Sequence, residues 1–355
     1  MTVPSILRGG GFVALLVVLP MFGLQHWVLN LLVFVLLFAT MSSAWNLVGG
    51  FAGYPSLGHA AFFGIGAYTM AWMFKGQVLA TGYEPFYLLP VVGLIGMAVG
   101  WPIAVIAMRT RADVFAIVTI TFLFVVQTLA FNLHGLTGGS QGAALPIPPF
   151  PNAVFEVPFY YALAILLLVT MGLTFGTMRS KLGLSLVAIR ADEDKARGIG
   201  VRVTGVKILA FSVSVGITAM AGAVWAYYES FIYPQFAVDP LITIAVVLMT
   251  FLGGRATLWG PVLGAVILES GQQLLTYQLG ALQFYLIAYA LIFLVIMLLL
   301  PRGILPTIEE RMRLARRRRR TDATAPGPGA QAGISDALRE ESQTDAVALT
   351  NGGAS

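Results

Sequence analysis

The sequence contains no cysteine, only three histidines and few charged residues. Asp, Glu, Lys and Arg together make up 10% of the 355 residues, and hydrophobic residues make up 58%, whereas soluble domains are about 25% charged. Without cysteine the chain has no disulfide framework and no thiolate metal site. The histidines lack the close spacing of helical metal ligands, so we expect no metal site. This is the composition of a protein whose solvent is the lipid bilayer.

Charged residues are missing altogether from residue 9 to residue 74. This run is long enough for three transmembrane helices of about 20 residues each. Further apolar stretches lie at 85–108, 114–131, 157–178, 208–228, 240–254, 256–274 and 281–301. The pattern predicts an all-α, polytopic membrane protein with about ten transmembrane helices. Because 240–254 is short, we expect a tilted or broken helix there, with about eight or nine crossings as the alternative.

The basic residues predict the orientation, because Lys and Arg accumulate on the cytoplasmic side of membrane proteins. With the N-terminus inside, Lys75 is the one basic residue of 21 that falls outside. Both termini are therefore predicted to be cytoplasmic. The net charge of +5 reflects this bias, and we expect no nucleic-acid binding. The apolar run after Arg8 continues into further spans without a prompt cleavage site, so we expect no cleaved signal peptide.

Two segments differ in composition from the predicted spans. Residues 135–158 are rich in Pro and Gly, too irregular for a helix, and are predicted to form an external loop. After residue 301 an arginine cluster is followed by small and polar residues that cannot bury enough surface to fold. We therefore predict a transmembrane domain at 1–301 and a basic, then disordered, cytoplasmic tail at 302–355.

Glycine and proline gather in Gly49–Tyr68 and again in Gly253–Ala265. Such density breaks a membrane helix, and broken backbone at membrane depth must be buried in protein or line a cavity. Close helix packing through small residues is a second interpretation, compatible with the first. Both segments start with a Gly pair and continue to a Pro, which either reflects an internal duplication or is a coincidence.

Polar residues in or beside the predicted spans are candidates for a translocation path. Glu269 is the acidic residue that we place well inside a span, about 15 Å deep. A buried ionisable group should face a polar cavity or a partner, and a structural hydrogen bond to a neighbouring helix is the alternative. The candidates are Asn46, Ser56, His59, Gln127, Asn132, Glu269 and Gln272.

The loop at 179–207 carries seven basic and three acidic residues. Leu184, Val187 and Ala188 recur near helical spacing, and Glu193 is placed to pair with Arg197 at i+4. The segment is predicted to form a short amphipathic helix outside the bilayer. A loop that only fixes topology needs no ordered apolar stripe, so the pattern favours a helix that docks a partner.

Four stretches resemble the branched-chain amino acid ABC-transporter permease family of the LivM type. They are NLVGGFAGYPSLGHAAFFGIGAY from Asn46, GLTGGSQG from Gly135, MRSKLGLSLVAIRADEDKARGIGV from Met178 and GGRATLWGPVLGAV from Gly253. Leu184 and Ser185 depart from the usual family pattern, as do Tyr54 and Pro55. These departures bear on substrate identity more than on the family.

The resemblance implies the permease subunit of an importer for branched-chain amino acids in a bacterial inner membrane. It implies as partners a second related permease, two ATP-binding cassette ATPase subunits and a periplasmic binding protein. It also implies that residues 184–200 form the coupling helix that docks into the ATPase. The ATPase-coupling candidates are Gly183, Leu184, Val187, Ala188, Arg190, Asp192 and Glu193.

No lysine in the sequence follows a glycine, so the chain has no G-x-x-x-x-G-K-[ST] phosphate loop. We therefore expect a transport subunit that is not an enzyme, needs no cofactor and receives its energy through a partner. Importers of urea, short amides or another amino acid are the nearest alternatives. An ion-coupled secondary transporter is a more distant one, because it needs carboxylates near the midplane and Glu269 alone qualifies.

Overall fold

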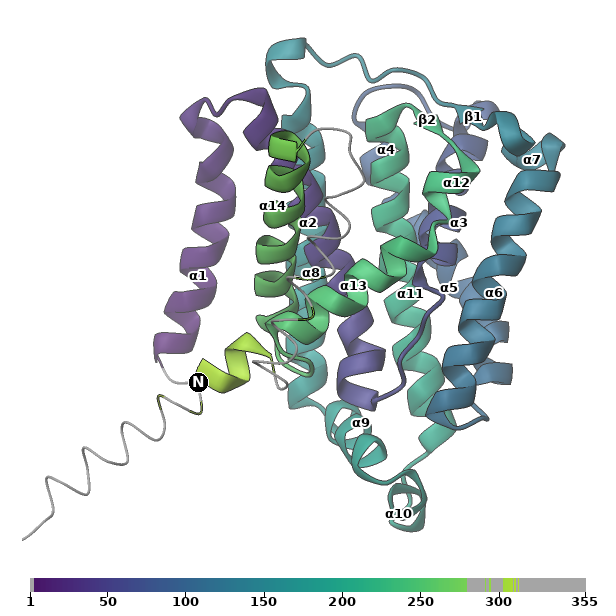
Figure 1. The fold of residues 1–355 in the computed structure, drawn as a ribbon, viewed down its shortest axis with the longest axis vertical. Helices are drawn as coiled ribbons and strands as arrows, with labels where there is room; N and C mark the ends of the chain where they lie inside the picture. Colours follow the sequence, from purple (N-terminus) through teal and green to yellow (C-terminus); the bar gives the residue numbers. More distant parts are fainter. Residues whose placement is uncertain are drawn as a thin grey trace, which may run out of the picture. The chain divides into compact units, whose positions relative to one another are not determined.

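The computed structural model describes residues 3–279, 291, 294, 303–308, 310 and 312. The chain divides into two compact units, 1–305 and 306–355, and long helices make up the first (Figure 1). The long helices described are α1 (Val3–Val18), α2 (His26–Trp45), α3 (His59–Lys75), α5 (Leu89–Ala107), α6 (Ala112–Asn132), α8 (Glu156–Arg179), α11 (Val203–Glu229), α13 (Pro240–Gly253) and α14 (Gly260–Leu279). Each overlies a predicted apolar stretch.

Six helical segments among the described residues are long and apolar enough to cross a membrane. Three long helices fall short of that standard: α1 and α3 have 16 and 17 residues, and α14 carries Glu269, Gln272 and Gln273. The prediction of an all-α, polytopic membrane protein is confirmed. The predicted stretch at 281–301, apart from positions 291 and 294, lies outside the described residues, and so does most of the predicted tail.

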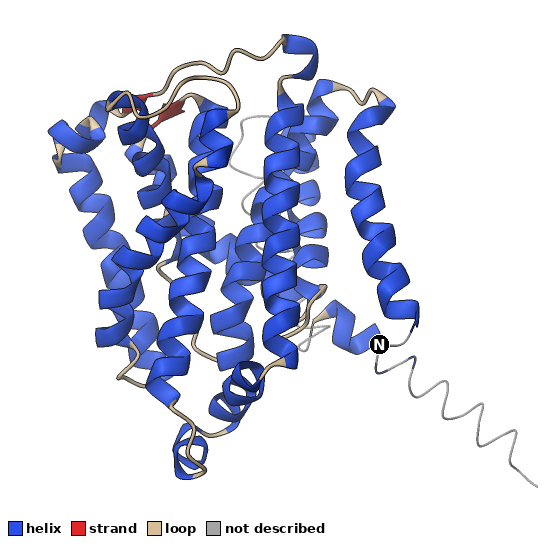
Figure 2. Cartoon of the chain, turned by 180° about the vertical axis from the view of Figure 1, so that it is seen from behind, coloured by secondary structure: helices blue, strands red, loops and turns tan. Residues whose placement is uncertain are grey.

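The first unit has two distinct ends. At one end, the lower one in Figure 1, α9 (Lys181–Ala191) and α10 (Glu193–Gly198) lie beyond the long helices, and α1 begins there too. The predicted loop at 135–158 lies at the opposite end, as Figure 2 also shows from behind. We call these the α9 end and the β1 end.

Short elements cover the β1 end. They are η1 (Leu19–Phe22), α4 (Glu84–Tyr87), α7 (His134–Thr137), η3 (Gly139–Gln141), β1 (Ala143–Ala144), η4 (Asn152–Val154) and β2 (Phe231–Ile232). β1 and β2 pair antiparallel, with Ala143 opposite Ile232. This two-residue ladder joins the loop to the end of α11 and is the one departure from helix and coil among the described residues.

α2 runs on into a broken segment before α3. Its helix continues as the π-helical η2 (Asn46–Ala52), which is buried throughout. An irregular stretch then runs from Gly53, whose φ of 76° favours glycine, to Gly58. We call residues 46–58 the broken segment. The break predicted in Gly49–Tyr68 is thus present, and its helical part is buried in protein, as a polar backbone at membrane depth requires.

The chain also breaks before α13, where α12 (Pro234–Ala237) is separated from it by two residues. The predicted break within 240–254 is not found, because α13 (Pro240–Gly253) is continuous; the interruption lies just before it, and α12 and α13 together form one candidate span of 20 residues.

The core is centred on α11, the most buried of the six candidate spans, at 72%. A Cβ added at Gly66 of α3 would lie 1.9 Å from the carbonyl oxygen of Ala219 in α11. At Gly222 it would lie 2.0 Å from the carbonyl oxygen of Phe63. The two helices therefore approach backbone to backbone, which small residues alone permit. The small-residue interpretation of the Gly-rich segment holds together with the break.

Candidate functional site

α9 presents an apolar face at the α9 end. Its buried side carries Gly183, Leu186 and Ile189, which pack toward the long helices, whereas Leu184 and Val187 are 71% and 53% exposed. Exposed aliphatic residues at helical spacing are the anchors that a short helix offers to a groove on a partner. A short helix is present as predicted, but it is not amphipathic, because apolar residues lie on its exposed side as well as on its buried side.

The prediction of one helix over 184–200 is wrong, because the segment forms two helices. Asp192 has an extended backbone (φ −166°, ψ 113°) and its carboxylate accepts a hydrogen bond from the backbone N–H of Lys195 at 3.0 Å. Asp is among the preferred N-cap residues, so this side chain ends α9 and starts α10. The predicted Glu193–Arg197 pair is confirmed, at 3.1 Å.

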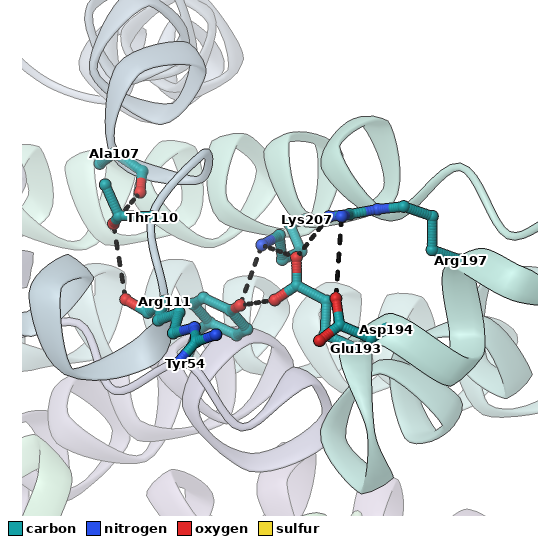
Figure 3. Close-up of polar contacts among 8 residues, drawn as sticks. All are labelled: Tyr54, Ala107, Thr110, Arg111, Glu193, Asp194, Arg197 and Lys207. Atoms are coloured by element: carbon teal, nitrogen blue, oxygen red, sulfur yellow. Dashed lines mark hydrogen bonds and ion pairs between the residues drawn. The ribbon is translucent and has the colours of Figure 1, made fainter.

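A charged cluster joins α10 to the broken segment and to α11 (Figure 3). Lys207 Nζ lies 3.1 Å from Glu193 Oε1 and donates a hydrogen bond to the Tyr54 hydroxyl at 3.0 Å. The Tyr54 hydroxyl donates to the other carboxylate oxygen of Glu193. The ammonium also lies 4.2 Å from the centre of the Tyr54 ring, within cation–π range. The Lys207 side chain is 1% exposed, so its charge is balanced inside the protein.

The surroundings hold Glu193 in its charged state and Tyr54 in its neutral state. Burial by itself would raise the pKa of Glu193, but hydrogen bonds from Tyr54 and Lys207 and the charges of Lys207 and Arg197 outweigh it and lower that pKa. Burial, together with the neighbouring Glu193 carboxylate, raises the pKa of Tyr54. At neutral pH Glu193 is therefore ionised and Tyr54 keeps its donor proton. An ammonium left here without its carboxylate would be a buried, uncompensated charge.

Arg190 makes a second link from α9 to the broken segment. Its guanidinium donates to the carbonyl oxygen of Gly50 at 2.9 Å, and a Cβ added at Gly53 would lie 2.9 Å from Arg190 Cγ. Burial, and then the charge of Arg255, lower the pKa of Arg190. The arginine side chain thus lies closely over a glycine whose lack of a side chain makes room for it.

The two Gly-rich segments meet beside this link. Asn46 accepts a hydrogen bond from the backbone N–H of Ala256 and donates one to the carbonyl oxygen of Thr257, both at 2.8 Å. Asn46, a predicted path residue, is 1% exposed. In the structure it holds the loop between α13 and α14 against the broken segment.

Ser56 and His59 form a second buried cluster, which is closed and uncharged. The Ser214 hydroxyl donates to the carbonyl oxygen of Ala44 at 2.6 Å, so it accepts from His59 Nε2 at 2.8 Å. His59 Nδ1 then accepts from the Ser56 hydroxyl at 3.0 Å, an assignment that follows from the hydrogen-bond network. This neutral cluster ties α2, the broken segment, α3 and α11 together.

The remaining path candidates are spread over the molecule. Gln127 donates to the carbonyl oxygen of Val238 at 3.0 Å. Asn132 is exposed and donates one turn back, to the carbonyl oxygen of Thr128, at 2.8 Å. Of the seven candidates the structure joins Ser56 and His59 by a hydrogen bond, and Glu269 and Gln272 lie one turn apart on α14.

Glu269 is 2% exposed on α14. It accepts a hydrogen bond from Gln273 at 3.2 Å, and its Oε2 has no partner among the described residues. Gln272 is half-buried. A role of these side chains in a translocation path stays a prediction.

Lys207 and Tyr54 were missed as functional residues. A lone lysine one turn into the apolar helix α11 is itself a signal, because a charge at the edge of a membrane helix needs a partner. Tyr54 was noticed only as a departure from a family pattern. Nothing in the sequence pairs two residues 153 positions apart.

The fold and this site define a class: a helical, multi-pass membrane protein that carries a short two-helix element beyond its long helices. Residues 27–300 match the family model described as branched-chain amino acid transport system, permease component, and the chain belongs to this family. The resemblance seen in the sequence is thereby confirmed.

Named relatives agree with this assignment. The chain is 28% identical to the high-affinity branched-chain amino acid transport system permease protein LivM of Salmonella typhimurium over 298 residues, 76% of this chain and 68% of the relative. It is 25% identical to LivH of the same organism, over 77% of this chain and 93% of the relative. It is also 30% identical to the autoinducer 2 import system permease protein LsrC of Yersinia enterocolitica, over 49% of each chain. No solved structure matches.

Proposed function

We propose that the chain is the permease subunit of an ATP-driven importer that carries branched-chain, hydrophobic amino acids across a bacterial inner membrane. In this proposal it crosses the membrane about ten times, with both termini and the α9 end in the cytoplasm. The position of Lys75 supports this orientation. The one basic residue predicted outside lies at the β1 end, where its Nζ donates to the carbonyl oxygen of Gly135 at 3.2 Å.

The observation that carries the proposal is the exposed apolar face of α9 on a chain without a phosphate loop. We assign ATPase docking to Leu184 and Val187, with the half-buried Ala188 at their edge. The other coupling candidates shape the element and anchor it: Arg190 and Glu193 bind the broken segment, and Asp192 starts α10. Gly183 lets α9 approach α8, since an added Cβ would lie 2.2 Å from the carbonyl oxygen of Thr177.

The proposed complex contains a second related permease, two ATP-binding cassette ATPases and a periplasmic binding protein. Similarity to both LivM and LivH supports a pair of related permeases. Similarity to an autoinducer 2 import permease shows that this likeness extends beyond amino acid systems, so urea, short amides or another amino acid are the alternative substrates. The test is the melting temperature of the binding protein encoded beside this chain, measured with each candidate ligand. The ligand that raises this temperature most is expected to be the substrate.

A carboxylate placed on the exposed face of α9 tests the docking. Val187→Asp puts a charge where the partner would bury it, at a cost of several kcal/mol. We expect the variant to insert normally yet to lose co-purification with the ATPase and substrate-stimulated ATP hydrolysis. Ile147→Asp is the matched control for co-purification with the ATPase, because Ile147 is 78% exposed in the loop at the β1 end, away from the proposed docking face. A Val187→Asp complex that assembles like the parent would contradict the assignment.

The energy source separates this proposal from an ion-coupled transporter. Proteoliposomes containing the whole complex should take up substrate when given ATP inside, without any ion gradient. Uptake driven by an ion gradient alone would favour the secondary transporter, with Glu269 as its coupling carboxylate.

A further inference from the structure

The charged cluster of Tyr54, Glu193 and Lys207 lies apart from the exposed face of α9. Glu193 starts α10, Lys207 lies one turn into α11, and Tyr54 belongs to the broken segment that leads into α3. The cluster thus joins the element outside the long helices to two of the helices that pack at the centre of the unit. The docking residues Leu184 and Val187 take no part in it.

Covalent connections alone would transmit little motion from α9 to α3. Asp192 interrupts the two short helices with extended backbone, so a push on α9 could be absorbed there by bending. Arg190 on the α9 side and Glu193 on the α10 side each hold the broken segment across this interruption. The broken segment therefore binds both α9 and α10, one on each side of the interruption at Asp192.

Further hydrogen bonds connect the broken segment to the core. Two residues after Tyr54, Ser56 hydrogen-bonds to His59 at the start of α3, and His59 bonds to Ser214 of α11 at 2.8 Å. α3 and α11 touch backbone to backbone at Gly66. A displacement of Tyr54 therefore reaches two central helices through short, directional contacts and does not depend on sliding apolar surfaces.

We infer that Tyr54, Glu193 and Lys207 form a clasp that makes α10, α11 and the broken segment move as one body. The clasp passes the motion of a docked ATPase to α3. These are positioning residues, since they reach the path through other groups. The inference rests on the proposed ATPase coupling, but it concerns transmission after docking and leaves the docking surface itself unchanged.

The test is the amount of substrate moved per ATP hydrolysed by the complete complex in proteoliposomes. The double variant Glu193→Gln/Lys207→Met removes both charges of this ion pair together, so the buried ammonium is not left uncompensated. The matched control is Asp194→Asn/Lys195→Met, which also removes one acidic and one basic residue. These two side chains are 84% and 85% exposed.

We expect the Glu193→Gln/Lys207→Met complex to co-purify with the ATPase and hydrolyse ATP, while substrate moved per ATP falls about fivefold or more, the low end of known coupling between sites. The control should match the parent. If the double variant fails to assemble, Glu193→Asp takes its place: it keeps the charge, shortens the side chain and should lower the same ratio. A parental ratio in either assembled variant overturns the clasp, whereas loss of assembly in Val187→Asp speaks only to docking.

Discussion

The broken segment contributes to two buried polar clusters only a few residues apart, and the two are built differently. Ser56 and His59 belong to a neutral cluster in which each described hydrogen-bond donor meets an acceptor inside the core. Tyr54 belongs to a charged cluster that binds an element lying outside the long helices. The first joins helices of the core to one another, and the second joins the core to a protruding pair of helices.

This difference suits two tasks. A neutral, fully paired cluster has no charge to desolvate, so it stabilises one arrangement of the helices at low cost. A buried ion pair adds little net stability compared with apolar packing, but it fixes geometry strictly. We therefore expect changes in the neutral cluster to alter stability and changes in the charged cluster to alter coupling.

His59→Leu should produce the largest effect on stability. It leaves the buried Ser56 hydroxyl without its acceptor, which costs about 1–3 kcal/mol, and removes the donor to Ser214, whose own bond to the carbonyl oxygen of Ala44 remains. The melting temperature of the purified chain should fall. His134→Leu is the matched control, since His134 is exposed and its ring bonds, among the described residues, to the nearby carbonyl oxygen of Asn132 alone. Equal melting temperatures for the two variants would show that the neutral cluster holds nothing together.

Arg190→Gln should have the next largest effect on stability, a loss of about 1.5 kcal/mol from the charge-assisted bond to the carbonyl oxygen of Gly50. Because this bond lies beside Asp192, the variant should loosen α9 without unfolding the core. Hydrogen exchange of the α9 amides should rise in Arg190→Gln and stay unchanged in Arg202→Gln, which replaces an exposed arginine. Equal hydrogen exchange in the two variants would mean that the bond from Arg190 to Gly50 does not hold α9 in place.

Tyr54→Phe should have a smaller effect than Tyr54→Leu. Phenylalanine loses the hydroxyl bonds to Lys207 and Glu193 but keeps the ring beneath the ammonium, an interaction of about 0.5–1 kcal/mol or more. Substrate moved per ATP should therefore rank parent, Phe, Leu. A phenylalanine variant as impaired as the leucine variant would mean that the ring contributes nothing to the clasp.

The smallest expected effect is that of pH. Because the pKa of Glu193 is lowered, the stability it contributes is present above the ordinary carboxyl range and is lost only as pH falls through the lowered value. The raised pKa of Tyr54 keeps its proton in place. Neither Glu193 nor Tyr54 should therefore change its protonation between about pH 6 and pH 8, and neither should add a slope to substrate moved per ATP in that range. A slope in the parent that disappears in Glu193→Gln/Lys207→Met would contradict these protonation states.

Hydropathy was enough to predict the long helices, because the bilayer demands apolar runs of fixed length. Dense glycine and proline were enough to predict the break after α2. The interruption at Asp192 was missed although its signal was local: an Asp followed by two further acids is a typical helix start. The clasp was beyond prediction, since it depends on how a lysine in α11 meets a tyrosine far away along the chain.

The absence of cysteine in this chain allows the central claim to be tested directly. Tyr54→Cys/Glu193→Cys in a Lys207→Met background removes the clasp from an otherwise thiol-free permease without leaving the buried ammonium uncompensated, and a short bis-maleimide can then join the two positions covalently. We predict that the complete complex moves little substrate per ATP before cross-linking and regains most of the parental ratio afterwards, while each single cysteine variant gains nothing from the reagent. A cross-linked complex that stays uncoupled would contradict the view that α10 and the broken segment must move as one body.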